Sequence, residues 1–206
     1  MSVSTTNRSE LIATIQGLHQ RRWCDGTGGN FSVVDQINPL VLMMAPSGVD
    51  KGQVRDQDII KINADGHVVY GEGQASAETP LHLMIIKQTD AGAVLHTHSP
   101  VGTVLSRHYE QNGFIHFEGW EMLKGLRGIN THETKVELPI VANDQDTNRL
   151  AEAIRPLLDR APNGLLVSGH GLYSWGRNIA EARRHVEIIE FLLDLSWKQH
   201  LLSLDK

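Results

Sequence analysis

The stretch Ala91-Gly92-Ala93-Val94-Leu95-His96-Thr97-His98-Ser99-Pro100 decides the fold. Its apolar first half predicts a central strand, and Ser99-Pro100 is typical of a capped helix start. Because side chains two apart on a strand point to the same face, His96 and His98 can both reach one metal ion. Two polar residues at a solvated strand end are the alternative. The apolar lead-in argues against it, since burying unpaired imidazoles costs free energy.

A third metal ligand is expected further along the chain. A catalytic zinc usually takes three protein ligands and leaves one position open for water or substrate. His170 is the best candidate, because it follows a short apolar strand and lies between two glycines that let other groups approach it. His82 and His185 are weaker candidates, since each lies on a predicted helix and can be a satisfied polar neighbour. Cys24 has no potential ligand beside it.

Helices and short strands alternate on both sides of this stretch. The connections between many strands are too short for crossover helices, which favours a mixed or largely antiparallel sheet. Helices are expected to cover both of its faces, giving an α/β fold. Three further helix starts are predicted from capping residues, at Asn7 with Glu10, at Thr79 before Pro80, and at Asn178 with Glu181. The predicted strands cover residues 31–34, 40–45, 59–62, 67–70, 93–98, 114–117, 136–141, 164–168 and 172–175.

Composition limits the class of protein. With 206 residues and 40% hydrophobic content, the chain can fold without disulfides or a structural metal, so a bound metal is expected to serve chemistry. A net charge of -5 without a basic run argues against nucleic acid as a partner. A single cysteine, a polar N-terminus and the lack of a long apolar run predict a cytoplasmic protein that does not bind membranes.

Two short glycine-containing segments can hold an anion. Gly28-Gly29-Asn30 and Ser47-Gly48 offer backbone amides and short polar side chains. Neither segment is a P-loop, because no Gly-Lys-Ser/Thr follows, and each can equally be an ordinary turn.

Two carboxylates are candidates for proton transfer. Glu78 lies at a predicted helix start, where a favourable interaction with the helix dipole is the alternative role. Glu121 has aromatic and apolar neighbours, and burial there would raise its pKa towards neutrality. Alternatively, Glu121 is exposed and pairs with Lys124, three residues on.

The chain resembles the class II aldolase/epimerase family of zinc sugar-phosphate enzymes through five segments in the same order. No single segment is specific, but the ordered set is, and with the flanking helices it covers nearly the whole chain. The segments are Gly28-Gly29-Asn30-Phe31-Ser32, Ser47-Gly48, Ser76-Ala77-Glu78, His96-Thr97-His98-Ser99 and Gly169-His170-Gly171.

This resemblance implies one domain over residues 1–206, built as a three-layer α/β/α sandwich. It implies one Zn²⁺ per subunit held by the three histidines, a small phosphorylated sugar as substrate, and a homotetramer with sites at subunit interfaces. It also implies a phosphate site made by Gly29, Asn30, Ser47, Gly48 and Ser76.

The segment Glu121–Gly125 resembles the one that carries the catalytic glutamate in dehydratases of this family. This implies loss of water from 5-methylthioribulose 1-phosphate, a step of methionine salvage. Glu78 stands where family aldolases keep their own proton-transfer carboxylate, so an aldolase or 4-epimerase of another phosphorylated ketose is the alternative. A scaffold protein has no reason to keep such a set of residues, and the His-Glu-x-x-His helix typical of zinc hydrolases is absent.

Overall fold

The computed structural model describes residues 3–204, in which nine strands form one sheet. The strands are β1 (Asn30–Gln36), β2 (Val41–Met44), β3 (Ile60–Asn63), β4 (Val68–Tyr70), β5 (Ala93–Thr97), β6 (Phe114–Glu118), β7 (Lys135–Val141), β8 (Gly164–Val167) and β9 (Gly171–Gly176). Their order is β4-β3-β2-β1-β5-β9-β8-β7-β6. Neighbours are antiparallel except β7 and β8, which are parallel. The mixed, largely antiparallel sheet is confirmed, with β5 at its centre.

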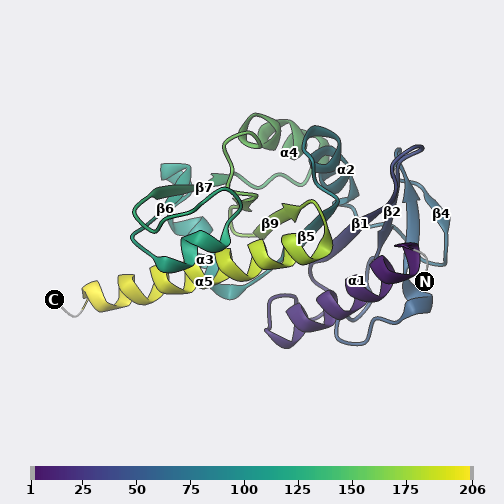
Figure 1. Cartoon of the computed structure of the whole chain (residues 1–206), viewed down its shortest axis with the longest axis horizontal. Coiled ribbons are helices and arrows are strands. Elements are labelled where there is room, and N and C mark those ends of the chain that lie inside the picture. The colour runs from purple at the N-terminus through teal and green to yellow at the C-terminus, as the bar shows by residue number, and fades with distance from the viewer. Residues whose placement is uncertain (1–2, 205–206) are drawn as a thin grey trace.

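Helices cover both faces of this sheet. The α-helices are α1 (Val3–Gln20), α2 (Thr79–Gln88), α3 (Pro100–His108), α4 (Thr147–Ile154) and α5 (Ile179–Leu204). Short 3-10 helices are η1 (Asp56–Asp58), η2 (Glu110–Asn112), η3 (Glu121–Gly125) and η4 (Arg155–Leu157). In Figure 1, α2 and α4 lie together on one side, whereas α1, α3 and α5 lie on the other.

The core shows how β5 holds these layers together. Leu95 is fully buried in a cluster formed by α1, α3 and α5, whereas its neighbour Val94 is fully buried in a second cluster formed by α2 and α4. Successive strand residues point to opposite faces, so the apolar run of β5 must be covered on both. Burying one such side chain stabilises the fold by about 1.5–3 kcal/mol. The three-layer α/β/α architecture is therefore confirmed.

Two of the predicted helix caps are wrong. Asn7 lies inside α1, which begins at Val3, and its side-chain amide donates to Val34 O at 3.3 Å, tying the helix to β1. Thr79 is the first residue of α2, and Glu78 occupies the cap position. The Asn7 side chain thus makes a contact with a distant strand instead of capping its helix, and the cap of α2 lies one residue before the predicted position.

Two other caps form as predicted. Ser99 accepts a hydrogen bond from Gly102 N at 3.1 Å. Helix α3 therefore begins directly after the histidine pair at the end of β5. Asn178 accepts one from Glu181 N at 2.8 Å at the start of α5. Within residues 3–204, no helix combines the length and apolar character that crossing a membrane requires.

Candidate active site

Three histidines from distant parts of the sequence meet at one end of β5. His96 lies on β5, His98 follows its end, and His170 lies in the turn between β8 and β9. The antiparallel pairing of β5 with β9 brings that turn beside the histidine pair. His96 Nε2 lies 2.7 Å from His98 Nε2 and 3.3 Å from His170 Nε2. The three imidazoles that the sequence singled out therefore converge.

The arrangement fits a metal ion. Two nitrogens bound to one tetrahedral zinc lie roughly 3.3 Å apart, close to these separations. His96 Nδ1 donates to Leu172 O at 3.0 Å, so its bare Nε2 faces the other two rings. Burial and the two neighbouring histidines hold the pKa of His96 well below its usual range. Burial and His170 lower the pKa of His98 as well. These two rings are neutral at pH 7, the state that ligates metals.

Glu78 completes a group of four metal-capable side chains. Its carboxylate lies 3.1 Å from His170 Nε2 and 3.6 Å from His96 Nε2. The ligand atoms of all four residues lie within 4.8 Å of one another. The Asn30 amide donates a hydrogen bond to the carboxylate and holds it in place. The sequence predicts Glu78 at a helix start as a candidate proton carrier, and the fold brings it into contact with two of the histidines.

His82 and His185 do not join this group. The fully buried His82 donates from Nε2 to Asn30 Oδ1 at 2.6 Å, and its Nδ1 lies 2.7 Å from Ser32 Oγ. Burial lowers its pKa to about 3, so it stays neutral and orients Asn30, which in turn holds Glu78. His185 Nδ1 donates to Trp175 O at 2.7 Å, at the other end of β9. Both are helix residues that serve neighbouring polar groups, as the alternative interpretation expected.

A cavity of about 420 Å³ opens from the metal group. His98, His170 and Glu78 line one part of it. The rest of its lining includes every residue that was predicted to hold phosphate: Gly29, Asn30, Ser47, Gly48 and Ser76. The fold thus brings the two glycine-containing turns to one cavity, although their role in phosphate binding stays a prediction.

Two glycines allow these approaches. A Cβ at Gly171 would lie 2.0 Å from Thr97 O, so only glycine lets β9 pass this close beside the end of β5. Gly29 has a φ of +75°, and a Cβ there would lie 2.8 Å from His96 O. That conformation directs Asn30 towards Glu78 and is one that glycine adopts readily.

Glu121 lies elsewhere, and the expected burial of its carboxylate is wrong for the single chain. Its side chain is 68% exposed, pairs with Lys124, and has one oxygen 3.5 Å from His132 Nδ1. The hydrogen bond from Lys124 lowers its pKa, the opposite of the predicted shift. The apolar neighbours explain this: Leu123 is buried in the core beneath α5, which turns Glu121 to solvent. Its proposed catalytic role stays a prediction.

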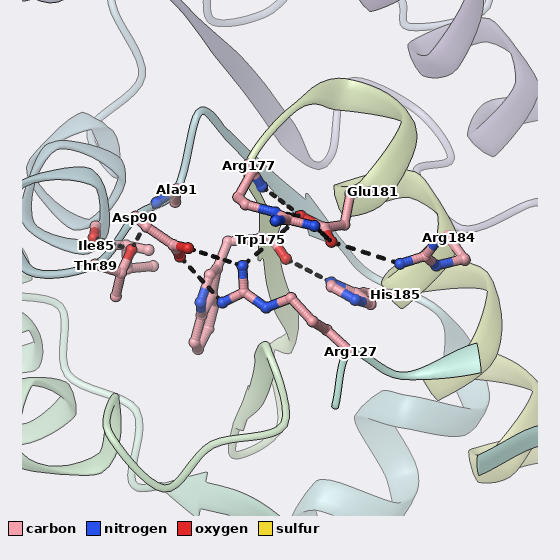
Figure 2. Close-up of polar contacts among 10 residues, drawn as sticks. All are labelled: Ile85, Thr89, Asp90, Ala91, Arg127, Trp175, Arg177, Glu181, Arg184 and His185. Carbon is pink, nitrogen blue, oxygen red and sulfur yellow. Dashed lines mark hydrogen bonds and ion pairs between the residues drawn. The ribbon is translucent and has the colours of Figure 1, made fainter. Parts of the chain in front are cut away.

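The segment that follows Glu121 is firmly fixed. Arg127 donates to both oxygens of Asp90, at 2.9 and 3.0 Å, and lies 3.8 Å from Glu181 (Figure 2). Glu181 also binds Arg177 and Arg184, and chiefly the hydrogen bond from Arg177 lowers its pKa to about 2. The network ties the loop after η3 to the beginning of β5 and to α5.

The sequence analysis missed Lys51, a charged residue of the cavity. Its side chain lines the same cavity as the two turns and is almost fully buried. The signal that could have identified it is its position, four residues after Ser47 in Ser47-Gly48-Val49-Asp50-Lys51.

Known proteins place this arrangement in a family. The model of the Class II Aldolase and Adducin N-terminal domain matches residues 9–197. Methylthioribulose-1-phosphate dehydratase of Xanthomonas campestris pv. campestris (strain 8004) is 45% identical over 185 residues, covering 89% of this chain and 84% of the relative. The protein of that name from Stenotrophomonas maltophilia (strain K279a) is 44% identical, covering 88% and 85%.

Solved structures share the fold at lower identity. L-fuculose 1-phosphate aldolase superposes with a TM-score of 0.79 at 23% identity, covering 98% of this chain and 89% of the aldolase. The L-fuculose-1-phosphate aldolase from Thermus thermophilus has a TM-score of 0.79 at 21% identity, with 98% of each chain covered. The match of the family model over most of the chain and the close relatives agree: the chain belongs to the class II aldolase and adducin N-terminal domain family.

Proposed function

We propose that this chain is a zinc-dependent hydro-lyase that dehydrates 5-methylthioribulose 1-phosphate to 2,3-diketo-5-methylthiopentyl 1-phosphate in methionine salvage. The observation that carries the proposal is a single cavity that lies between the group of three imidazoles and a carboxylate and the two glycine-containing turns. The names of relatives about 45% identical to this chain support the choice of reaction.

The histidines His96, His98 and His170 would hold the metal, with Glu78 able to contribute a carboxylate oxygen. A bound zinc ion would supply a Lewis acid that polarises a ketone and stabilises negative charge on adjacent oxygens. Three imidazoles are a donor set that suits zinc and leaves room for substrate.

The side chains of the protein then have to move protons. Dehydration removes the proton at C3 and expels the C4 hydroxyl as water, which requires a base and an acid. The resulting enol takes up a proton at C4 and becomes the 2,3-diketone. Glu78 faces the cavity beside the histidines and can accept a proton from substrate there. The turns holding Asn30, Ser47 and Ser76 keep the phosphate, and hence C3 and C4, at a fixed distance from it.

Glu121 serves as the second proton carrier from a neighbouring subunit of a homotetramer. In the single chain its carboxylate is exposed and does not line the cavity, so it can act only on a site that another copy provides. Burial of the Glu121 carboxylate in such an assembly would raise its pKa, which the hydrogen bond from Lys124 lowers in the single chain. A cytoplasmic location, expected from the single cysteine Cys24 and the composition, belongs to the same proposal.

Product analysis tests the reaction directly. The purified zinc-loaded protein is incubated with 5-methylthioribulose 1-phosphate, and the phosphorylated products are followed by ³¹P NMR and mass spectrometry. One five-carbon product, lighter by one water, is expected. The place of Glu78 beside the histidines favours an aldolase as the second candidate, and dihydroxyacetone phosphate plus an aldehyde would identify it.

A further inference from the structure

Lys51 is a buried cation that faces the candidate phosphate site. It is 1% exposed. Its Nζ donates to Thr27 O at 3.0 Å and to Val49 O at 3.1 Å. These carbonyls come from the residue before Gly28 and the residue after Gly48, so the ammonium lies between the two turns that line the cavity.

Within the part of the chain that the structure describes, Asp50 attracts the charge of Lys51 without forming an ion pair with it. No carboxylate in residues 3–204 forms an ion pair with its Nζ. The adjacent Asp50 instead accepts hydrogen bonds from Gly52 N at 2.9 Å and from Gln53 at 3.0 Å. Asp144, which lines the cavity, is held by Arg149 at 2.7 Å. Burial accordingly lowers the pKa of Lys51.

A buried charge without a partner is costly, and an anion beside it removes that cost. An ammonium has three N–H donors, and the two carbonyls use two of them. A phosphate that reached the amides of the two turns would accept the third and would balance the charge. The protein as a whole is acidic, with a net charge of -5, so an anionic group must be attracted by such a local cation.

We propose that Lys51 supplies the positive charge that binds the substrate's phosphate, and that it joins the two phosphate-binding turns through Thr27 and Val49. This inference rests on the proposed phosphate site but not on the reaction carried out at the metal. Its test therefore measures anion binding separately from turnover.

The principal variant is Lys51→Gln, which keeps N–H donors for the two carbonyls and loses the charge. Binding of inorganic phosphate to the zinc-loaded protein is measured by isothermal titration calorimetry at constant ionic strength. Lys51→Gln should weaken it about 10- to 100-fold, the range for a hydrogen bond between charged groups. KM for 5-methylthioribulose 1-phosphate should rise in parallel, while kcat and zinc content change less than about threefold.

Lys87→Met is the matched control. Lys87 also donates to a backbone carbonyl, Ala64 O at 2.8 Å, but it is exposed and lies outside the cavity. Its loss should leave phosphate binding unchanged. Wild-type phosphate affinity in Lys51→Gln would overturn the proposal. If Lys51→Gln loses phosphate binding but the wild-type protein does not turn over the thioether substrate, only the proposed reaction is refuted.

A measurement on the wild-type protein covers the case in which Lys51→Gln does not fold. With ¹⁵N-labelled lysine, the slowly exchanging ammonium signal of the buried Lys51 should shift when inorganic phosphate is added, and those of exposed lysines should not. A Lys51 signal that stays unchanged at saturating phosphate would contradict the proposal.

Discussion

Glu190 offers a quantitative test of how the metal-bearing strand is supported. This carboxyl group lies on α5, is 3% exposed, and accepts hydrogen bonds from Thr97 Oγ1 at 3.0 Å and Ser99 Oγ at 2.5 Å. These two hydroxyls flank His98. Burial raises the pKa of Glu190 to about 7, from 4.5 in an exposed glutamate. In the folded protein the protonated form is therefore favoured below about pH 7.

The sign of the effect follows from the direction of this shift. Below about pH 4.5 both folded and unfolded chains carry the proton, and Glu190 does not affect the pH dependence. Between about pH 4.5 and 7 the unfolded chain ionises first, so stability falls as pH rises. A difference of about 2.5 between the two pKa values corresponds to about 3 kcal/mol, since one pKa unit is about 1.4 kcal/mol.

Glu190→Gln removes this ionisation while keeping a carbonyl that can accept from a hydroxyl. Urea unfolding at constant protein concentration should show that the free energy of unfolding of the variant, relative to wild type, is about 2–3 kcal/mol larger at about pH 8 than at about pH 5. Glu187→Gln, on the same helix but paired with Arg183 at 2.9 Å, is the control and should show no such change. An equal effect of Glu190→Gln at both pH values would show that the ionisation of Glu190 does not control stability in this pH range.

Three further predictions concern the site and the assembly. Wild-type protein should carry about one zinc per chain, and the double variant His96→Ala/His98→Ala should lose it; metal retained in a one-to-one ratio would rule the site out. Glu121→Gln should lower turnover about 10²- to 10⁴-fold with metal content unchanged; near wild-type turnover, together with an inactive Glu78→Gln, would assign the proton transfer to Glu78 alone. Light scattering should give the mass of a tetramer, and mixing Glu121→Gln subunits with the histidine double variant should restore part of the activity; a monomer mass, or mixtures that stay inactive, would contradict a site shared between subunits.

The sequence was most informative where local pattern and burial agree. The apolar run before His96 must be a buried strand, and the alternation of side chains on it then determines that His96 and His98 share a face. Strand lengths and turns likewise predicted the mixed sheet. His170 could be placed because its flanking glycines permit the close contact with β5 that Gly171 makes.

The remaining features depend on contacts that no local pattern contains. Glu121 has apolar neighbours in sequence, but the 3-10 helix directs Leu123 inward and the carboxylate outward. Apolar neighbours in sequence therefore did not predict burial of the Glu121 carboxylate. Lys51 resembles an ordinary loop lysine until the fold encloses it between two turns. Asn7 has the pattern of a helix cap, but its side chain lies within α1 and donates a hydrogen bond to Val34 O of β1.

The reaction itself is tested most directly by isotope incorporation. Zinc-loaded protein is incubated with 5-methylthioribulose 1-phosphate in D₂O, and the product is examined by NMR and mass spectrometry. A dehydratase must protonate the final enol at C4, so we expect one five-carbon 2,3-diketone phosphate with deuterium at C4. Cleavage to dihydroxyacetone phosphate and an aldehyde, or an intact ketose that has kept its C4 hydroxyl, would contradict it.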